Sequence, residues 1–373
     1  RPEQNYTFFM LRSREINAFA TLGGYIGFNA GLFLMAERED EIAAVLAHEI
    51  VHVTQRHVLR GVERAQKDSI PIMLAMLGAL VAAQSAGGDG DATQAVLAGG
   101  MGIMQQRQIN YTRSNEHEAD RLGIQTLARA GYDPLAMADV FARMERTLRG
   151  NQGGWQAPEY LRTHPVSTTR ISEAKDRARQ LKADAGGGTA CVRPPEGGAE
   201  LCQHTELHGL LYVPEAPVNP LLPPGLTPTA LESGAGARTR EAPDTSLFAF
   251  ARERLRVLSA ESWSAAVAEY DRIREATPDA FDDASRYGQA IALSRAGQTV
   301  VAARELEVLA QRHPSLYWVS LAQAENDHRG GQQAAAAARF EALLRDLPRN
   351  RAVILGYADN LIEIGTPASG RKA

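Results

Sequence analysis

The segment His48-Glu-Ile-Val-His52 carries two histidines and a glutamate at the spacing of a metal site. Side chains four residues apart on a helix project from the same face, so both imidazoles can reach one ion. Glu49 lies one residue past the first histidine, where it can accept a proton from a water molecule bound to that ion. These residues predict the geometry of a zinc peptidase.

The residues before this motif favour a functional site over a chance match. Ile42-Ala-Ala-Val-Leu-Ala47 is apolar at every position, as expected for a helix that is buried on all sides. Such burial suits a site that must exclude bulk water. The alternative is a core helix whose histidines are only hydrogen-bonded.

A catalytic zinc ion takes three protein ligands and keeps one position open. His57 is the nearest further histidine, but it should point elsewhere on the helix, so we place it behind the ligands or at the surface. Glu116 and Asp120 are four residues apart and share a helix face, so one can bind the metal while the other fixes a ligand ring. Glu118 is rotated by about 200° from Glu116 and should not share that role. The alternative for this stretch is an exposed charged helix.

The two motifs, His48–His52 and Glu116-x-x-Ala119-Asp120, together resemble the HtpX and CAAX-prenyl-protease family of gluzincin metallopeptidases. The extended segments His48–His57 and Gln108–Arg121 are most similar to its periplasmic β-barrel assembly-enhancing branch. That branch joins this kind of peptidase to a tetratricopeptide-repeat domain.

The resemblance implies one Zn²⁺ ion per chain, held by three ligands: His48, His52 and Glu116. It implies Glu49 as the general base and Asp120 as the residue that orients a ligand from behind. It also implies an edge strand near Ile16–Ile26, of the kind that lies antiparallel to a bound peptide in zincins.

Thr163-His164-Pro165 matches another position of the same branch. A histidine there can approach the zinc as a fourth ligand, displace the catalytic water and hold the enzyme inactive, since neutral imidazole binds zinc well. Alternatively, His164 assists catalysis by donating a hydrogen bond to the oxyanion, or it is only a loop histidine. Arg170 is a candidate for pairing with a substrate or a structural partner.

Composition limits the classes of function. The chain has 373 residues, of which 44% are hydrophobic, enough for two or more globular domains. A net charge of −4 without a long basic run argues against nucleic-acid binding. Arg1–Gln4 reads as an internal start without a signal peptide, so a periplasmic location is implied only by the resemblance. Cys191 and Cys202 could close a disulfide loop in an oxidising compartment or remain two thiols.

One uncharged stretch raises the question of a membrane. Ser69–Gly88 has no charged residue, and Ile70–Ala83 is almost wholly apolar. The apolar stretch is shorter than the ~20 residues of a spanning helix, and it contains Pro71 and Gly78. We therefore expect a core helix and no transmembrane span. The alternative is a mobile apolar flap beside the site that touches a membrane surface or an unfolded client.

The last third of the chain repeats with a period of 34, as in Gly297, Gly331 and Gly365. Small residues recur where two helices would cross, and a proline follows each second helix. This is the tetratricopeptide pattern, whose concave face binds peptides or proteins; the alternative is a set of unrelated helical hairpins. Because the last unit stops after one helix, the array is expected to continue beyond Ala373.

The sequence thus predicts a mainly α chain in three parts. A zincin-type metallopeptidase domain with a small β-sheet covers residues 1–182, a Gly/Pro-rich linker covers 183–246, and a tetratricopeptide-repeat domain covers 247–373. Leu210–Val213 is a candidate strand or docking segment in the linker. The resemblance implies zinc-dependent hydrolysis of misfolded or misassembled outer-membrane proteins, with the repeats binding clients or their assembly machinery. The alternative function is a chaperone-like adaptor in which His164 keeps the site shut.

Overall fold

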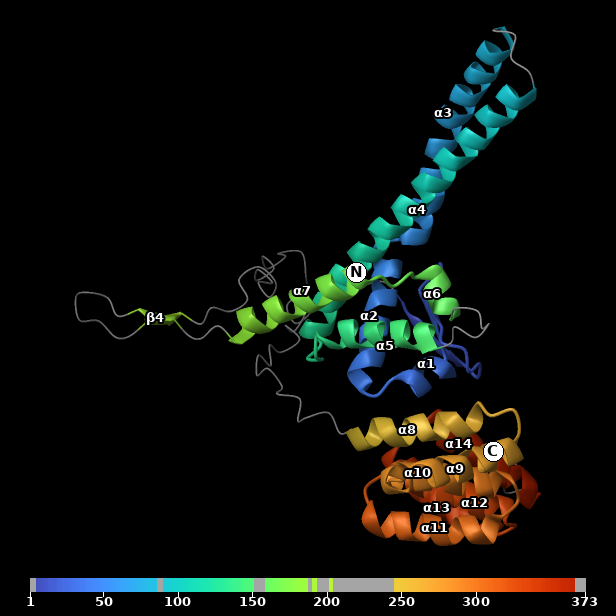
Figure 1. Cartoon of the computed structure of the whole chain (residues 1–373). Helices are drawn as coiled ribbons and strands as arrows, with labels where there is room; N and C mark the ends of the chain where they lie inside the picture. Colours follow the sequence, from blue (N-terminus) through green and yellow to red (C-terminus); the bar gives the residue numbers. More distant parts are fainter. Residues whose placement is uncertain are drawn as a thin grey trace, which may run out of the picture. The chain divides into compact units, whose positions relative to one another are not determined.

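The computed structural model describes residues 5–85, 90–150, 158–186, 190–192, 201–203 and 245–365. In these ranges the chain is mostly helical with a small three-stranded sheet, which confirms the predicted fold class (Figure 1). The chain divides into two compact units. The first consists of Arg1–Met10, Ile16–Phe28 and Asp40–Glu241, and the second of Leu11–Glu15, Asn29–Glu39 and Ala242–Ala373.

The sheet supplies the edge strand that the resemblance implied. Its strands are β1 (Thr7–Leu11), β2 (Ala18–Ala20) and β3 (Tyr25–Asn29), in the order β1-β3-β2. β2 runs antiparallel to β3 and has no further strand on its other side among the described residues. Gly23 and Gly24 form the turn with φ of +88° and +85°, a left-handed conformation that glycine adopts without strain.

Three helices build the centre of the first unit. Helix α2 (Glu39–Thr54) is buried along most of its length, as its apolar sequence predicts. It is followed by α3 (His57–Ser85) and α4 (Gly90–Arg129), which pack against each other as a long hairpin (Figure 1). Gly123 lets α4 approach α2 closely, because a Cβ atom there would lie 3.3 Å from the backbone nitrogen of His48. Helix α5 (Ala136–Gly150) and helix α7 (Thr168–Gly186) complete this layer.

The prediction that the apolar stretch of α3 forms a core helix is wrong. Ile70 and Leu74 are each 64% exposed, and only 6% of the apolar part of this helix is buried. Apolar periodicity alone cannot distinguish a helix buried in protein from one that meets another apolar medium.

The second unit is an array of helices, as predicted. The helices are α8 (Thr245–Leu258), α9 (Trp263–Ala276), α10 (Asp283–Arg295), α11 (Thr299–Arg312), α12 (Tyr317–Arg329), α13 (Gln333–Asp346) and α14 (Arg351–Ile364). The residues related by the 34-residue period fill its core, since Leu306 and Phe340 are both fully buried. A short helix, α1 (Ala30–Met35), lies against α8 in the same unit.

Most of the predicted linker lies outside the described residues. Two short strands within it, β4 (Ala190–Val192) and β5 (Leu201–Gln203), pair so that Cys191 is opposite Cys202 in the register. The candidate segment Leu210–Val213 is outside the described ranges, as are the residues after Gly365. The linker boundaries and the disulfide therefore stay predictions.

Candidate metal centre

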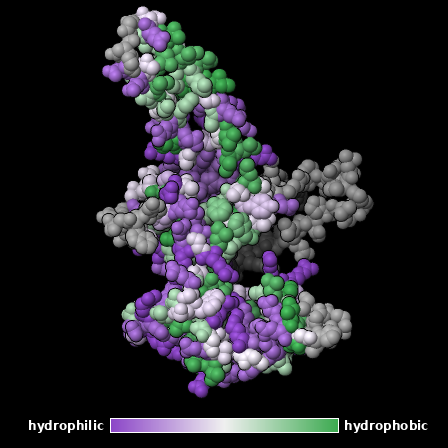
Figure 2. Space-filling model, turned by 90° about the vertical axis from the view of Figure 1, so that its right-hand side faces the viewer, coloured by the Kyte–Doolittle hydropathy of each residue, from purple (hydrophilic) through white to green (hydrophobic). Residues whose placement is uncertain are grey.

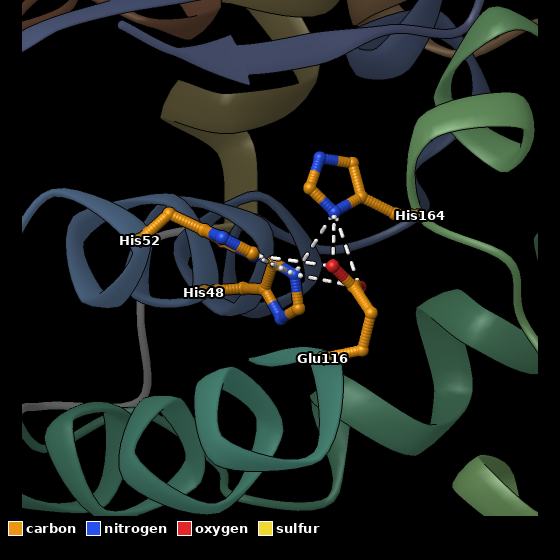
Figure 3. A group of neighbouring side chains, drawn as sticks. All are labelled: His48, His52, Glu116 and His164. Carbon is orange, nitrogen blue, oxygen red and sulfur yellow. Dashed lines mark hydrogen bonds and ion pairs between the residues drawn. The ribbon is translucent and has the colours of Figure 1, made fainter. Parts of the chain in front are cut away.

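Four side chains converge on one point of the first unit (Figure 3). They are His48 and His52 of α2, Glu116 of α4, and His164, which directly follows α6 (Glu159–Thr163). Each offers one nitrogen or oxygen atom, and these atoms all lie within 4.8 Å of one another. The structure thus brings together the four residues that the sequence predicted as metal ligands.

Local sequence explains how His164 reaches this point. Pro165 disfavours helical backbone at the residue before it. Helix α6 accordingly ends at Thr163, and His164 has φ of −122° and ψ of 76°. Its backbone N–H still donates to the carbonyl oxygen of Tyr160 at 2.7 Å, which holds the residue against the end of the helix.

The separations within the cluster fit a zinc ion. The Nε2 atoms of His48 and His52 are 3.0 Å apart, and His164 Nδ1 lies 3.4 Å from His48 Nε2. The Glu116 carboxylate oxygens lie 3.0 Å from His164 Nδ1 and 3.4 Å from His48 Nε2. Atoms bound tetrahedrally to zinc at ~2.0–2.1 Å are about 3.3 Å apart. Three imidazoles and one carboxylate are also the donors that zinc prefers.

A buried ion pair supports the cluster from behind. Asp120 Oδ1 lies 3.0 Å from His48 Nδ1, the ring nitrogen that points away from the cluster. Both oxygens of Asp120 accept hydrogen bonds from Arg170, at 2.7 and 2.8 Å. Arg170 is also 3.1 Å from Glu116 and stacks over the ring of Phe141. Arg170 therefore has the structural partner that the sequence left open, although its role could not be read from the motif.

Protonation differs between the two helix histidines. Burial and, to a smaller extent, the neighbouring His48 together lower the pKa of His52 to about 2, so this imidazole is neutral. Burial would also lower the pKa of His48, but hydrogen bonding with Asp120 and Glu116 raises it to about 10. Ligand histidines bind metal in the neutral form, so a bound cation would replace the His48 proton.

Glu49 faces the cluster without a hydrogen bond of normal geometry to either carboxylate oxygen among the described residues. Its side chain is buried, since the residue is 1% exposed. Oε1 lies 3.7 Å from His164 Nε2. Burial raises the pKa of Glu49, while His164, His48 and the backbone N–H of Ala20 on β2 partly offset the rise. A buried carboxylate without hydrogen bonds indicates a site built for a group that binds there.

A second line of support lies behind His52, where His57 takes one of the two positions that the sequence left open for it. His57 Nδ1 lies 3.0 Å from His52 Nδ1, and His57 Nε2 lies 3.2 Å from a carboxylate oxygen of Glu118. Glu118 also accepts a hydrogen bond from Arg60 at 3.0 Å. The reason is a break in the helix: Arg56, with φ of +53°, separates α2 from α3 and turns His57 back toward His52. No glycine marks this break, so helical spacing gave the wrong direction for His57.

Tyr160 is a site residue without a signal in the sequence. It is fully buried, and its ring stacks on His164 with centroids 4.8 Å apart. Its hydroxyl has no hydrogen-bond partner among the described residues. The ring therefore fixes the plane of the His164 imidazole.

A cleft leads to the cluster from outside. Its volume is about 420 Å³, and its lining includes His52, Glu116 and His164. The outer walls come from the first turns of α3, including Val58 and Val62, and from the facing part of α4. The cluster can therefore be reached by a chain that enters beside the base of the hairpin.

Two histidines on one helix, a glutamate on a second helix and a buried glutamate between them define the class of zincin-type metallopeptidases. Comparison with known proteins agrees with this class. Residues 1–178, just under half of the chain, match peptidase family M48 and so resemble an M48 peptidase domain. Members of such a family use a metal ion, for which the cluster provides the donors.

Three relatives illustrate the similarity. A Vibrio cholerae protein, provisionally named a β-barrel assembly-enhancing protease, is 48% identical over 176 residues, or 47% of this chain. The β-barrel assembly-enhancing protease of Escherichia coli K12 is 38% identical over 177 residues, or 48% of this chain. The chain covers 35% of the length of each. The metalloprotease LoiP of Escherichia coli K12 is 30% identical over 46% of this chain and 62% of its own length.

Proposed function

We propose that the protein is a zinc-dependent endopeptidase in which His48, His52 and Glu116 hold the metal. The observation that carries this proposal is the Glu49 carboxylate, which is buried and without a hydrogen bond among the described residues, beside a set of convergent metal donors. A buried carboxylate without hydrogen bonds destabilises a fold, so its presence argues for a chemical role. In the metallopeptidase class that role is general base catalysis.

A zinc ion at this site would polarise the scissile carbonyl and lower the pKa of the attacking water. Glu49 accepts the proton of that water and delivers it to the leaving amine. Burial raises its pKa toward neutrality, which suits a group that both takes and gives a proton. The unpaired edge of β2, next to Glu49, would hold an extended substrate by antiparallel backbone hydrogen bonds.

We infer that His164 acts as a latch. Its Nδ1 atom lies 3.0 Å from Glu116 and 3.4 Å from His48, inside the donor set, where water and substrate would need access. A fourth protein ligand makes a zinc site closed, as in structural sites. Because His164 is carried by the short helix α6, opening requires a displacement of this segment only. The other role, donation to the oxyanion, would need the same imidazole to withdraw from the donor set.

The substrates are proposed to be misassembled outer-membrane proteins in the periplasm. The names of the relatives support this client class, and the helical array of the second unit supports protein binding. We propose that the array is a set of tetratricopeptide repeats that hold a client or a component of the assembly machinery.

The test is casein cleavage by the zinc-loaded protein, its Glu49→Gln variant and its His164→Ala variant, with the zinc content of each measured. We expect cleavage by the parent, loss in Glu49→Gln with zinc retained, and an increase in His164→Ala. A decrease in His164→Ala with zinc retained would make His164 a catalytic participant instead. Cleavage that persists in Glu49→Gln would overturn the proposed base.

A chaperone-like adaptor is the second candidate, favoured by the position of His164 within the donor set. In that case the closed site is the working state, and the helical array performs the function. Complementation of a strain that lacks the protein distinguishes the two. An adaptor would work equally well with Glu49→Gln, whereas a peptidase would not.

A further inference from the structure

The outer part of the α3–α4 hairpin is apolar and exposed at the same time, up to a polar end that carries Gln84 and Ser85 on α3 and Asp91 and Gln94 on α4. Its hairpin tip, defined as residues 70–83 of α3 and 95–104 of α4, contains no polar side chain. Figure 2 shows apolar surface gathered on this hairpin. Large exposed side chains of the tip include Ile70, Met73, Leu74, Leu77, Val81, Met101 and Ile103, each at least 54% exposed. An apolar surface of this kind needs a non-aqueous partner.

Two ordinary explanations do not fit this segment. A core helix of a soluble protein would be largely buried, yet only 6% of the apolar part of α3 is buried. A signal sequence lies at the start of a chain, whereas α3 follows the helix that carries His48 and His52, within the peptidase domain. The hairpin tip is thus an integral part of the domain that faces outward.

The distribution of apolar residues favours lipid over a protein partner. A helix that docks on a protein is amphipathic and keeps a polar face toward the solvent. Neither helix of the hairpin tip has such a polar face. Along α3 the less exposed residues are Ile72, Met76 and Leu80, which recur every fourth position and form the seam of the hairpin. On α4, Met101 and Ile103 point to nearly opposite sides at ~100° per residue, and both are exposed. Apolar surface therefore surrounds the pair of helices.

Charged residues mark a boundary at one level of the hairpin. Asp68 on α3 pairs with Arg107 on α4 at 3.0 Å, and Arg64 lies 3.9 Å from Asp68. Beyond this level α3 carries no charge as far as Ser85, a length of about 26 Å at ~1.5 Å per residue. The hydrocarbon core of a bilayer is ~30 Å thick, and local thinning accommodates a mismatch of a few ångström. Arg64 and Arg107 are exposed at this level, where cations would meet lipid phosphates if the apolar part lay in a bilayer.

We propose that the hairpin tip inserts into the acyl layer of a lipid bilayer and anchors the domain there. The anchor also sets the height of the cleft. Val58, in the cleft wall, lies on the same helix as Ser69, so about 17 Å separates the two positions along α3. The peptidase site would then face chains close to the membrane surface. The inference does not depend on peptidase activity, because it rests on the hairpin alone.

Vesicle flotation tests the anchor with the chain itself. The probes are vesicles of phosphatidylethanolamine and phosphatidylglycerol at 3:1, and vesicles of phosphatidylcholine alone. We expect the parent to float with both, more strongly with the anionic mixture, and the double variant Leu74→Asp/Leu77→Asp to bind at least tenfold more weakly. The matched control is Val300→Asp, an equally exposed apolar residue on α11, which should float like the parent. All variants are first checked for unchanged helical content and melting temperature.

A second measurement separates insertion from surface attraction. Leu74→Trp should give additional tryptophan emission that shifts to the blue with vesicles and is quenched by lipids brominated on the acyl chain. Flotation abolished by salt, with no acyl-chain quenching, would overturn insertion in favour of binding to headgroups. Absence of flotation with both mixtures would overturn the anchor. If the parent does not float but is dimeric in solution, and Leu74→Asp/Leu77→Asp is monomeric, the hairpin tip is an interface between two copies of the chain and not an anchor.

Discussion

The two halves of helix α4 reverse the usual relation between polarity and burial. Its first half carries Met101 and Ile103, which are 64% and 54% exposed. Its second half carries Glu116 and Asp120, which are 3% and 5% exposed. One continuous helix therefore presents apolar residues to the outside and encloses its carboxylates.

This difference indicates that neither half is adapted to contact with water. The buried half suits a ligand, and the exposed half suits an apolar medium. The buried carboxylates lie within 3.0 Å of nitrogen atoms of His48, His164 and Arg170, and their remaining capacity suits a metal cation. The exposed apolar half lacks a comparable protein partner among the described residues apart from the seam with α3. Departures from ordinary burial occur where a protein meets a ligand or another medium, and both halves fit that rule.

The largest effect is expected from Glu116 in the buried half. We expect Glu116→Gln to lose stoichiometric zinc and peptidase activity, because the amide replaces the only carboxylate that contacts all three histidines of the cluster. Zinc affinity is measured by competition with a chelating dye. Glu118→Gln is the comparison variant two residues away, and it should weaken zinc binding far less than Glu116→Gln. Equal losses in the two variants would remove the distinction between ligand and support.

Arg170 tests whether the ion pair behind the site maintains the buried half. Arg170→Met should lower the free energy of unfolding by about 3–5 kcal/mol, because the buried Asp120 loses the guanidinium that binds both of its oxygens. Urea denaturation of the metal-free protein measures this loss. The double variant Asp120→Asn/Arg170→Met should recover a large part of it. If the single and double variants are equally unstable, the loss comes from the contact with Phe141 and not from charge.

The same ion pair predicts how metal-free protein responds to acid. Burial tends to raise the pKa of Asp120, but hydrogen bonds from Arg170 and His48 lower it below its usual value. A carboxyl group with a lowered pKa in the folded state contributes stability that is complete above its unfolded pKa of ~3.9 and is lost below it. The parent should thus lose more stability than Asp120→Asn between pH 5 and pH 3. Parallel stability curves would contradict this contribution.

His57 should have a smaller effect than the direct ligands. His57→Ala is expected to weaken zinc binding by about 10–100-fold, as is typical for residues that orient a ligand ring. The reason is the 3.0 Å contact with His52 Nδ1, which fixes the ring from behind. Glu118→Gln, which keeps the side-chain shape, should lie between His57→Ala and the parent. An unchanged affinity in His57→Ala would show that the contact does not hold the ligand.

These residues also show how far the sequence could predict the site. The four clustered donors follow from helical spacing and from the resemblance, because the motif itself fixes which residues share a face. For His57 the sequence left two positions open, behind the ligands or at the surface, since the chain turns at Arg56 without a glycine or proline to signal it. The helical content of 57–85 is visible in the sequence, but its exposure is not. The composition of a helix indicates that it is not stable in water. It does not indicate whether the helix packs against protein or lies in lipid.

The smallest effect is expected at the exposed half of α4, and it is as informative as the largest. Met101→Ala should change the free energy of unfolding by no more than ~0.5 kcal/mol, because the side chain is 64% exposed and has little packing to lose. Leu127→Ala on the same helix, at a residue only 1% exposed, should cost about 2–5 kcal/mol. Urea denaturation of the two variants compares apolar truncations within one helix. If Met101→Ala lowered the free energy of unfolding as much as Leu127→Ala, the hairpin tip would be buried by protein contacts in solution. Its apolar side chains would then not be available to a membrane. A near-zero cost means that these side chains contribute nothing to folding in water, so the reason for their presence must be sought in what the hairpin meets outside the protein.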